Sequence, residues 1–168
     1  MATELYDLTV PVFRRGFASM SAILDKGRAH ADEHELPHDL LLGARLYEDM
    51  APLTAQVQRA SDAAKFAAAR LAQIEGPAMP DTETSFDELQ ARIAATIAFL
   101  DSVDAAAMNG REDADITIKT PNKSFTMKGR AYVLNFVVPN FYFHATTVYA
   151  ILRAKGVPVG KMDFLGGI

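Results

Sequence analysis

Apolar residues recur at three- and four-residue steps in four stretches of the chain, a pattern that predicts four long amphipathic helices. The first stretch runs from about Leu5 to Arg28. A short turn of helix at about Asp39 to Ala44 leads into the second, which ends near Ile74. The third covers about Phe86 to Ser102, and the fourth follows Gly129 and continues to about Ala154.

Local signals mark the ends of these helices. Pro11 should kink or delay the start of the first helix, because proline lacks a backbone N–H donor. Ser85 followed by Glu88 has the spacing of a capping box, and Gly156 is a stop signal for the fourth helix. On the second helix, the apolar line that we expect in the core is Leu46, Met50, Leu53, Val57, Ala60, Ala64, Ala67 and Leu71.

Between Asp115 and Lys128 the apolar period changes to two residues, which predicts a β-hairpin with a turn at 121–123. The fold class is therefore mainly α: a four-helix bundle, with a small β-hairpin between the third and fourth long helices. Residues 1–168 are interpreted as a single domain. In the tail after Gly160, Phe164 and Leu165 are the expected anchors. The hairpin is expected to cap the bundle or to cover the mouth of a pocket.

Composition narrows the function classes. With 168 residues, 49% of them hydrophobic and 23% charged, the chain can bury a core without crosslinks. A net charge of −4 gives no electrostatic signal for nucleic acid or an anionic membrane surface, so neither is expected as a partner. The absence of cysteine excludes disulfides and cysteine-based metal sites.

Two features bear on location. The amino terminus lacks a basic start followed by an apolar run, so it does not resemble a secretory signal, and a cytoplasmic location is expected. The 22 residues between Arg130 and Arg153 carry no formal charge and are long enough to span a bilayer. They include Asn135, Pro139 and His144, and a lone helix in lipid would leave such groups unpartnered, so we interpret the segment as a buried bundle helix.

The sequence contains no common nucleotide-binding, zinc-protease or hydrolase motif. His30, His34 and His38 are spaced four residues apart, as metal ligands on one helix face would be. Pro37 breaks the helix before the third histidine, and acidic residues are interleaved. We therefore interpret this cluster as a solvated helix end.

A second group of polar residues is predicted near the bundle seam. Asp49 and Gln56 flank the apolar line of the second helix, while Asn140 and His144 share one face of the fourth. Burial among aromatic neighbours would lower the pKa of His144 unless a carboxylate compensates, and Asp49 is the candidate partner. The alternative is that His144 is a satisfied core residue. Pro139 could open a pocket beside this face or only curve the helix.

The fourth helix also carries a family resemblance. Val138-Pro-Asn-Phe-Tyr-Phe-His144, Ile151-Leu-Arg-Ala-Lys-Gly156 and Lys161-Met-Asp-Phe164 resemble the DinB/YfiT-like superfamily, in particular the bacterial domain-of-unknown-function family numbered nineteen ninety-three. Leu5 to Phe13, Pro52-Leu53 and Asp81 to Thr84 support this resemblance, which covers nearly the whole chain.

The resemblance implies a four-helix bundle in which many superfamily members hold a divalent metal through three histidines. The leucine-arginine pair Leu152-Arg153 places His144 on one ligand position, Asn140 on a second and Gln56 on the third. Two of the three implied ligands are thus replaced by amides, which are weak neutral donors, so no metal and no other cofactor is expected.

Three functions follow as hypotheses. The leading one is a DinB-like bundle without the metal site that binds a small polar molecule in a pocket formed by Asp49, Gln56, Asn140, Tyr142 and His144. The second is an enzyme resembling superfamily thiol transferases and isomerases, with His144 as base or sole nitrogen ligand and Asp49 as its orienting group or second ligand. The third is a homodimer that pairs through Phe164 and Leu165.

Overall fold

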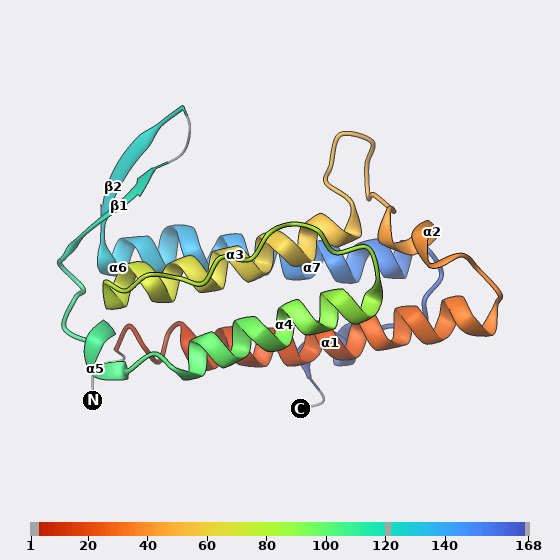
Figure 1. Cartoon of the computed structure of the whole chain (residues 1–168), viewed down its shortest axis with the longest axis horizontal. Helices are drawn as coiled ribbons and strands as arrows, with labels where there is room; N and C mark the ends of the chain where they lie inside the picture. The colour runs from red at the N-terminus through yellow and green to blue at the C-terminus, as the bar shows by residue number, and fades with distance from the viewer. Residues whose placement is uncertain (1–3, 120–121, 167–168) are drawn as a thin grey trace.

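The computed structural model describes residues 4–119 and 122–166 and is built around four long helices. These are α1 (Val10–Glu33), α3 (Leu53–Ala72), α4 (Phe86–Asp101) and α7 (Val138–Ala154). They lie side by side along the long axis of the molecule (Figure 1), with extensive packing of α3 on α7 and of α4 on α1 and α3. The mainly helical bundle predicted from the periodicity is confirmed.

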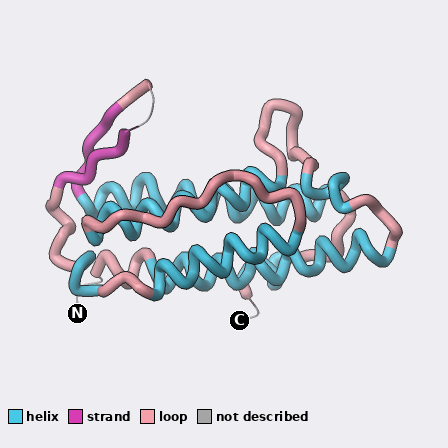
Figure 2. The backbone as a smooth tube through the Cα atoms, viewed as in Figure 1, coloured by secondary structure: helices cyan, strands magenta, loops and turns pink. Residues whose placement is uncertain are grey.

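The connection between α3 and α4 gives the bundle its topology. Residues 73–85 return along the length of the bundle before α4 begins, so α3 and α4 point in the same direction (Figure 1). The return segment has no regular secondary structure (Figure 2). α1 and α7 run the opposite way, so each of the pairs α3–α7 and α1–α4 is antiparallel.

The core follows the predicted apolar lines. Leu53, Val57, Ala60, Ala64, Ala67 and Leu71 of α3 are all fully buried. On the other side of the bundle, the ring of Phe141 lies 4.9 Å from that of Phe13 and 5.1 Å from that of Phe17, centroid to centroid. Gly16 allows this close approach, because a Cβ there would lie 2.5 Å from the Phe141 ring.

Short elements complete the fold: α2 (His38–Leu42), α5 (Ala105–Met108), α6 (Gly129–Tyr132) and α8 (Lys161–Leu165). The predicted hairpin is present as β1 (Asp115–Lys119) and β2 (Ser124–Lys128), which pair antiparallel with Ile118 opposite Phe125. It projects from the end of the bundle at which α6 begins (Figure 2). Residue 121 of its predicted turn lies outside the described residues.

The fourth predicted helix is continuous but not uniform. α6 leads into a π-helical segment, η1 (Val133–Val137), which leads directly into α7. Pro139 is at the start of α7, so the wider turn of η1 lies where proline removes a donor to the preceding turn. The irregularity predicted at Pro139 is therefore local widening of the helix just before it.

Three predicted boundaries differ from the structure. α1 begins at Val10 and not near Leu5, which is the delay expected from Pro11: proline is favoured in the first turn of a helix, where its missing N–H costs no hydrogen bond. α1 also continues to Glu33, beyond the predicted end at Arg28. The second long helix begins at Leu53, directly after Pro52, and residues 43–52 form a loop. Leu46 is therefore 46% exposed, and Met50 is outside the helix.

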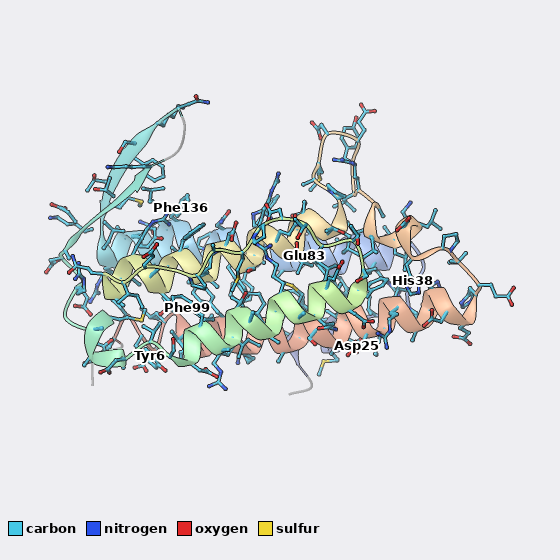
Figure 3. All side chains as sticks on the ribbon, in the orientation of Figure 1. Tyr6, Asp25, His38, Glu83, Phe99 and Phe136 are labelled. Atoms are coloured by element: carbon cyan, nitrogen blue, oxygen red, sulfur yellow. The ribbon has the colours of Figure 1, made fainter. Side chains whose placement is uncertain are left out.

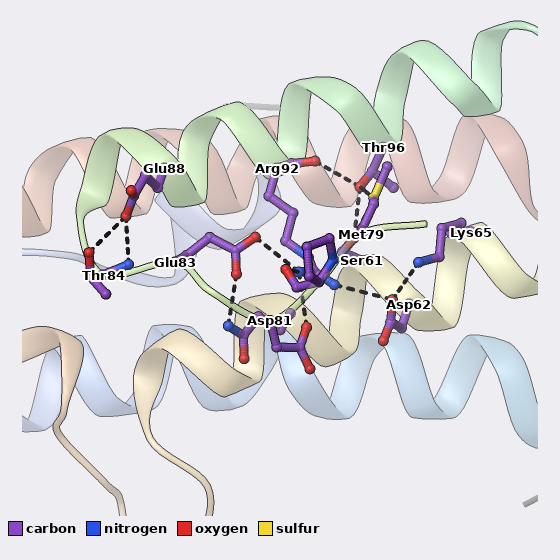
Figure 4. A network of polar contacts seen from close by, with 12 residues as sticks. Ser61, Asp62, Lys65, Met79, Asp81, Glu83, Thr84, Glu88, Arg92 and Thr96 are labelled. Carbon is purple, nitrogen blue, oxygen red and sulfur yellow. Dashed lines mark hydrogen bonds and ion pairs between the residues drawn. The ribbon is translucent and has the colours of Figure 1, made fainter. Parts of the chain in front are cut away.

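A buried arginine fastens the return segment to the bundle. Arg92 of α4 lies 3.0 Å from Asp81, 2.9 Å from Glu83 and 3.2 Å from Asp62, with its side chain 1% exposed (Figure 4). It also donates to the carbonyl of Pro80. These contacts hold residues 80–83 against α3 and α4.

The tail folds back on its own bundle. Lys26 of α1 pairs with Asp163 of α8 at 2.6 Å, and the Phe164 ring lies 5.9 Å from Tyr149 of α7. Phe164 thus anchors the tail as predicted, within the same chain; pairing with a second copy stays a prediction. Within the described residues, no helix is long and apolar enough to cross a membrane.

Candidate functional site

His144 lies on the face of α7 that packs against α3, and it is 8% exposed. Its ring Nδ1 lies 2.7 Å from Oε1 of Gln56 on α3. The Nε2 group of Gln56 in turn donates to the carbonyl of Ala51, at 2.9 Å. Gln56 and His144, which the resemblance matches to two ligand positions of one site, are therefore in contact, and the loop before α3 holds the amide in place.

This chain of bonds fixes the tautomer of the imidazole. Since the Gln56 nitrogen donates to Ala51, only its oxygen faces His144, so Nδ1 carries the proton and donates it. Nε2 is left with a lone pair. Within the described residues Nε2 makes no hydrogen bond, and it is not among the fully enclosed unpartnered atoms. It is therefore a hydrogen-bond acceptor open to a small molecule.

His144 is neutral near pH 7. Burial and, to a smaller extent, the positive charge of Arg59 together lower its pKa from 6.5 to about 4. No carboxylate contributes to the shift. Asp49, the predicted compensating partner, lies in the exposed loop and not on a helix. The prediction that Asp49 would lie on a helix at the seam was wrong because Pro52 delays the start of α3.

A groove of about 250 Å³ opens beside His144, between α3, β1 and the α6–α7 stretch. We call it the α3–α7 groove. Its α3 wall consists of Arg59, Asp62, Ala63, Phe66 and Arg70; the opposite wall consists of Tyr132, Phe136, Val137, Asn140 and His144; Ile118 and Lys119 of β1 complete it. The hairpin therefore covers one end of the groove, and Phe136 lies near the hairpin's base (Figure 3).

The groove carries excess positive charge. Arg59, Arg70 and Lys119 have no carboxylate within ion-pair distance among the described residues. The single acidic lining residue, Asp62, already pairs with Lys65 at 2.8 Å and with Arg92 at 3.2 Å (Figure 4). Asp62 is thus engaged by other cations and leaves the groove's own cations uncompensated.

The end of the groove nearest the hairpin combines a cation with a buried hydroxyl. Arg70 Nη1 donates to the Tyr132 hydroxyl at 3.0 Å, and the guanidinium lies 5.1 Å from the Phe66 ring. Tyr132 is 1% exposed, and burial raises the pKa of its hydroxyl. The hydroxyl therefore keeps its proton, for which the described residues provide no acceptor.

The other predicted site residues are only partly brought together. Asn140 lines the groove together with His144, one helical turn away. Tyr142 does not line it: this residue faces a separate cavity of about 50 Å³ with Gly16 and Phe164. Two residues along a helix turn the side chain by about 200°, so Tyr142 lies on the opposite face of α7 from Asn140 and His144.

The three positions matched to metal ligands do not fit a tightly held divalent cation. Gln56 has both ends of its amide engaged, by His144 and by Ala51. This leaves one imidazole nitrogen and the weak amide of Asn140, beside the positive charge of Arg59. The described residues contain no group of three or more histidine, aspartate or glutamate side chains placed to hold a metal.

His30, His34 and His38 are separate from this site. His38 pairs with Asp32 at 2.7 Å, and its side chain is 39% exposed. It lies at the end of the bundle away from Phe136 and the hairpin (Figure 3). The histidine cluster is thus a solvated helix end, as predicted.

The sequence contained an unused signal for the rest of the groove. Tyr132, Phe136, Asn140 and His144 recur every four residues, and Arg59, Ala63, Phe66 and Arg70 recur on α3 at steps of four, three and four residues. The second set lies one position from the predicted core line, so it borders the buried seam. Reading the two lines as facing walls would have identified Arg70 and Tyr132.

Residues 5–165 match the family model described as "Domain of unknown function (DUF1993)". A crystal structure of a DinB family member protein from Shewanella denitrificans is similar to this chain, with 40% sequence identity and a TM-score of 0.89. The match covers 98% of this chain and 93% of that one. A search of curated proteins finds no match.

Proposed function

This chain belongs to the DUF1993 family and has a DinB-like fold, as the sequence predicted, and we propose that it is a small-molecule-binding bundle whose ligand occupies the α3–α7 groove. The observation that carries the proposal is the open Nε2 of His144. A buried imidazole with a fixed tautomer presents one acceptor to a concave, partly aromatic surface. The ligand therefore donates a hydrogen bond at that end of the groove.

The size of the groove limits the ligand. At about 250 Å³ it is smaller than the roughly 300–1,000 Å³ of pockets for drug-sized molecules. Phe66, Phe136 and Ala63 offer apolar walls between the polar ends. A molecule of one or two rings, with an O–H or N–H at one end, suits this space.

The chemistry of His144 supports binding over proton abstraction. A general base is most effective when its pKa lies near the working pH, and the pKa of His144 is about 4. At neutral pH the ring is an acceptor that does not hold an abstracted proton well. The enzyme hypothesis would need a bound group that raises this pKa.

The proposal is tested with phenol as the probe on protein labelled with ¹⁵N-histidine. Phenol should shift the Nε2 resonance of His144 saturably, whereas anisole, which has no donor, should not. The variant Ala63→Phe fills the groove and should abolish the shift, whereas Ala94→Phe on the exposed face of α4 should leave it unchanged. A phenol response that persists in Ala63→Phe, or no response in the parent protein, would overturn the proposal.

A further inference from the structure

The hairpin end of the α3–α7 groove offers hydrogen-bond donors without an acceptor. The Tyr132 hydroxyl accepts from Arg70, so its own proton points to no described partner. Arg70 uses one of its N–H donors in that bond, and a guanidinium carries five. An almost fully buried donor without a partner is destabilising, and a bound acceptor would remove that cost.

The charges at this end point to an anion. Lys119 of β1 lines the groove together with Arg70, and Asp62 is held by Lys65 and Arg92. The whole chain carries a net charge of −4, so an uncompensated cationic groove is a local feature and does not follow from overall composition. A carboxylate matches the planar guanidinium in shape and can accept from it through both oxygens.

The guanidinium is also held in place for this contact. Its carbon lies 5.1 Å from the centre of the Phe66 ring, which supports one face of the group, and the Tyr132 hydroxyl fixes one edge. A side chain already held in one position loses less freedom on binding than a free arginine would. The adjacent Phe136 ring, stacked on Tyr132 at 6.0 Å, supplies an apolar surface next to the cation.

From this arrangement we infer that the groove takes a small aromatic acid, bound with its carboxylate at Arg70, Tyr132 and Lys119 and its ring along Phe66 and Phe136. This inference rests on the proposed function for the His144 end, and it adds the ligand class that the hairpin end selects.

The test compares an acid with its neutral counterpart. Para-hydroxyphenylpropionate should bind the full-length protein at least tenfold more tightly than its primary amide, measured by calorimetry at low salt. Arg70→Gln and Tyr132→Phe should each bring the two affinities close together by weakening the acid. Arg153→Gln, at an exposed site outside the groove, should leave the ratio unchanged. Thermal unfolding of each variant confirms that it is folded.

The outcomes separate the two claims. If acid and amide bind equally well in the parent protein, the anion inference is wrong while ligand binding at His144 stands. If the acid remains favoured after Arg70→Gln, the carboxylate is not at Arg70 and the inference fails. If neither compound nor phenol binds, the proposed function itself is wrong.

Discussion

The direction of one hydrogen bond decides what His144 can recognise. The Ala51 carbonyl accepts from the Gln56 amide, so that amide must accept from Nδ1 of the imidazole. Nε2 then accepts and cannot donate. A change that reversed the amide would make the same ring a donor at the groove, so Gln56 sets the polarity of the site without touching a ligand.

Titration of His144 should link stability to pH. Its folded-state pKa is about 4, below the ordinary 6.5, so the unfolded chain takes up a proton that the folded chain resists. Stability from this residue is complete above about pH 6.5 and is lost as pH falls toward 4, by about 3 kcal/mol.

This effect is measured by urea unfolding of the parent protein and His144→Gln across that pH range. The parent should lose stability relative to the variant as pH falls. His34→Gln, at an exposed histidine, is the matched control and should track the parent protein. A constant difference between the parent and His144→Gln would contradict the assigned pKa shift.

At the residue scale, the sequence predicted that Asn140 and His144 share one face of α7. Through the family resemblance it also placed Gln56 and His144 in one site. It did not place Asp49 or Tyr142 correctly. The apolar spacing of Leu46 and Met50 is typical of an earlier start of the second helix. In the structure that helix begins only after Pro52, and both residues lie in the preceding loop. Which side chain meets which across two helices depends on their axial offset, and helix periodicity alone does not contain it.

Among the elements, α1 and α7 approach each other closely where glycine faces an aromatic ring. A Cβ on Gly16 would lie 2.5 Å from Phe141, whose ring is fixed between Phe13 and Phe17. This contact joins α7 to α1, and neither residue lines the α3–α7 groove. A change at Gly16 therefore tests the packing of α7 and not ligand binding.

Gly16→Ala should therefore destabilise the protein by about 1–3 kcal/mol, even though alanine is the better helix former by up to about 1 kcal/mol. Gly27→Ala is the matched comparison, because a Cβ there comes closest to the flexible tip of Leu152, at 3.1 Å, and lies at an ordinary contact distance of 3.6 Å from the Phe86 ring. Urea unfolding should rank Gly16→Ala as clearly the more destabilised. Equal effects would show that the Phe141 ring can move aside.

Element boundaries were predictable where a local signal exists. Ser85 and Glu88 form the capping box at the start of α4, and Gly156 ends α7 with a positive φ of 89°. The hairpin was predicted from its two-residue period. The π-helical segment η1 was not predicted, because Pro139 indicates that a helix must adapt but not whether it bends or widens.

For the whole molecule, the Arg92 network is the main polar link between segments distant in sequence. It joins α3 through Asp62, the return segment through Asp81 and Glu83, and α4 through its own backbone (Figure 4). Removing the arginine would leave three carboxylates close together without their shared cation.

Arg92→Met should lower the free energy of unfolding by about 3 kcal/mol and release residues 77–84 to proteolysis. Arg14→Met removes an exposed pair with Asp101 and should change stability by less than about 1 kcal/mol. Limited proteolysis with mass spectrometry locates the first cut. Unchanged resistance of the return segment in Arg92→Met would show that its packing, and not Arg92, holds it.

The return segment also constrains how fast the chain can fold. Because α3 and α4 run parallel, these neighbours in sequence cannot form a simple helical hairpin, and α1 and α3 share few contacts. The main antiparallel partners are distant in sequence: α2 and α3 lie between α1 and α4, and α4, α5, the hairpin, α6 and η1 lie between α3 and α7. Long loops must therefore close before the stabilising pairs form, so this mainly helical chain should fold more slowly than an up-and-down bundle of equal length.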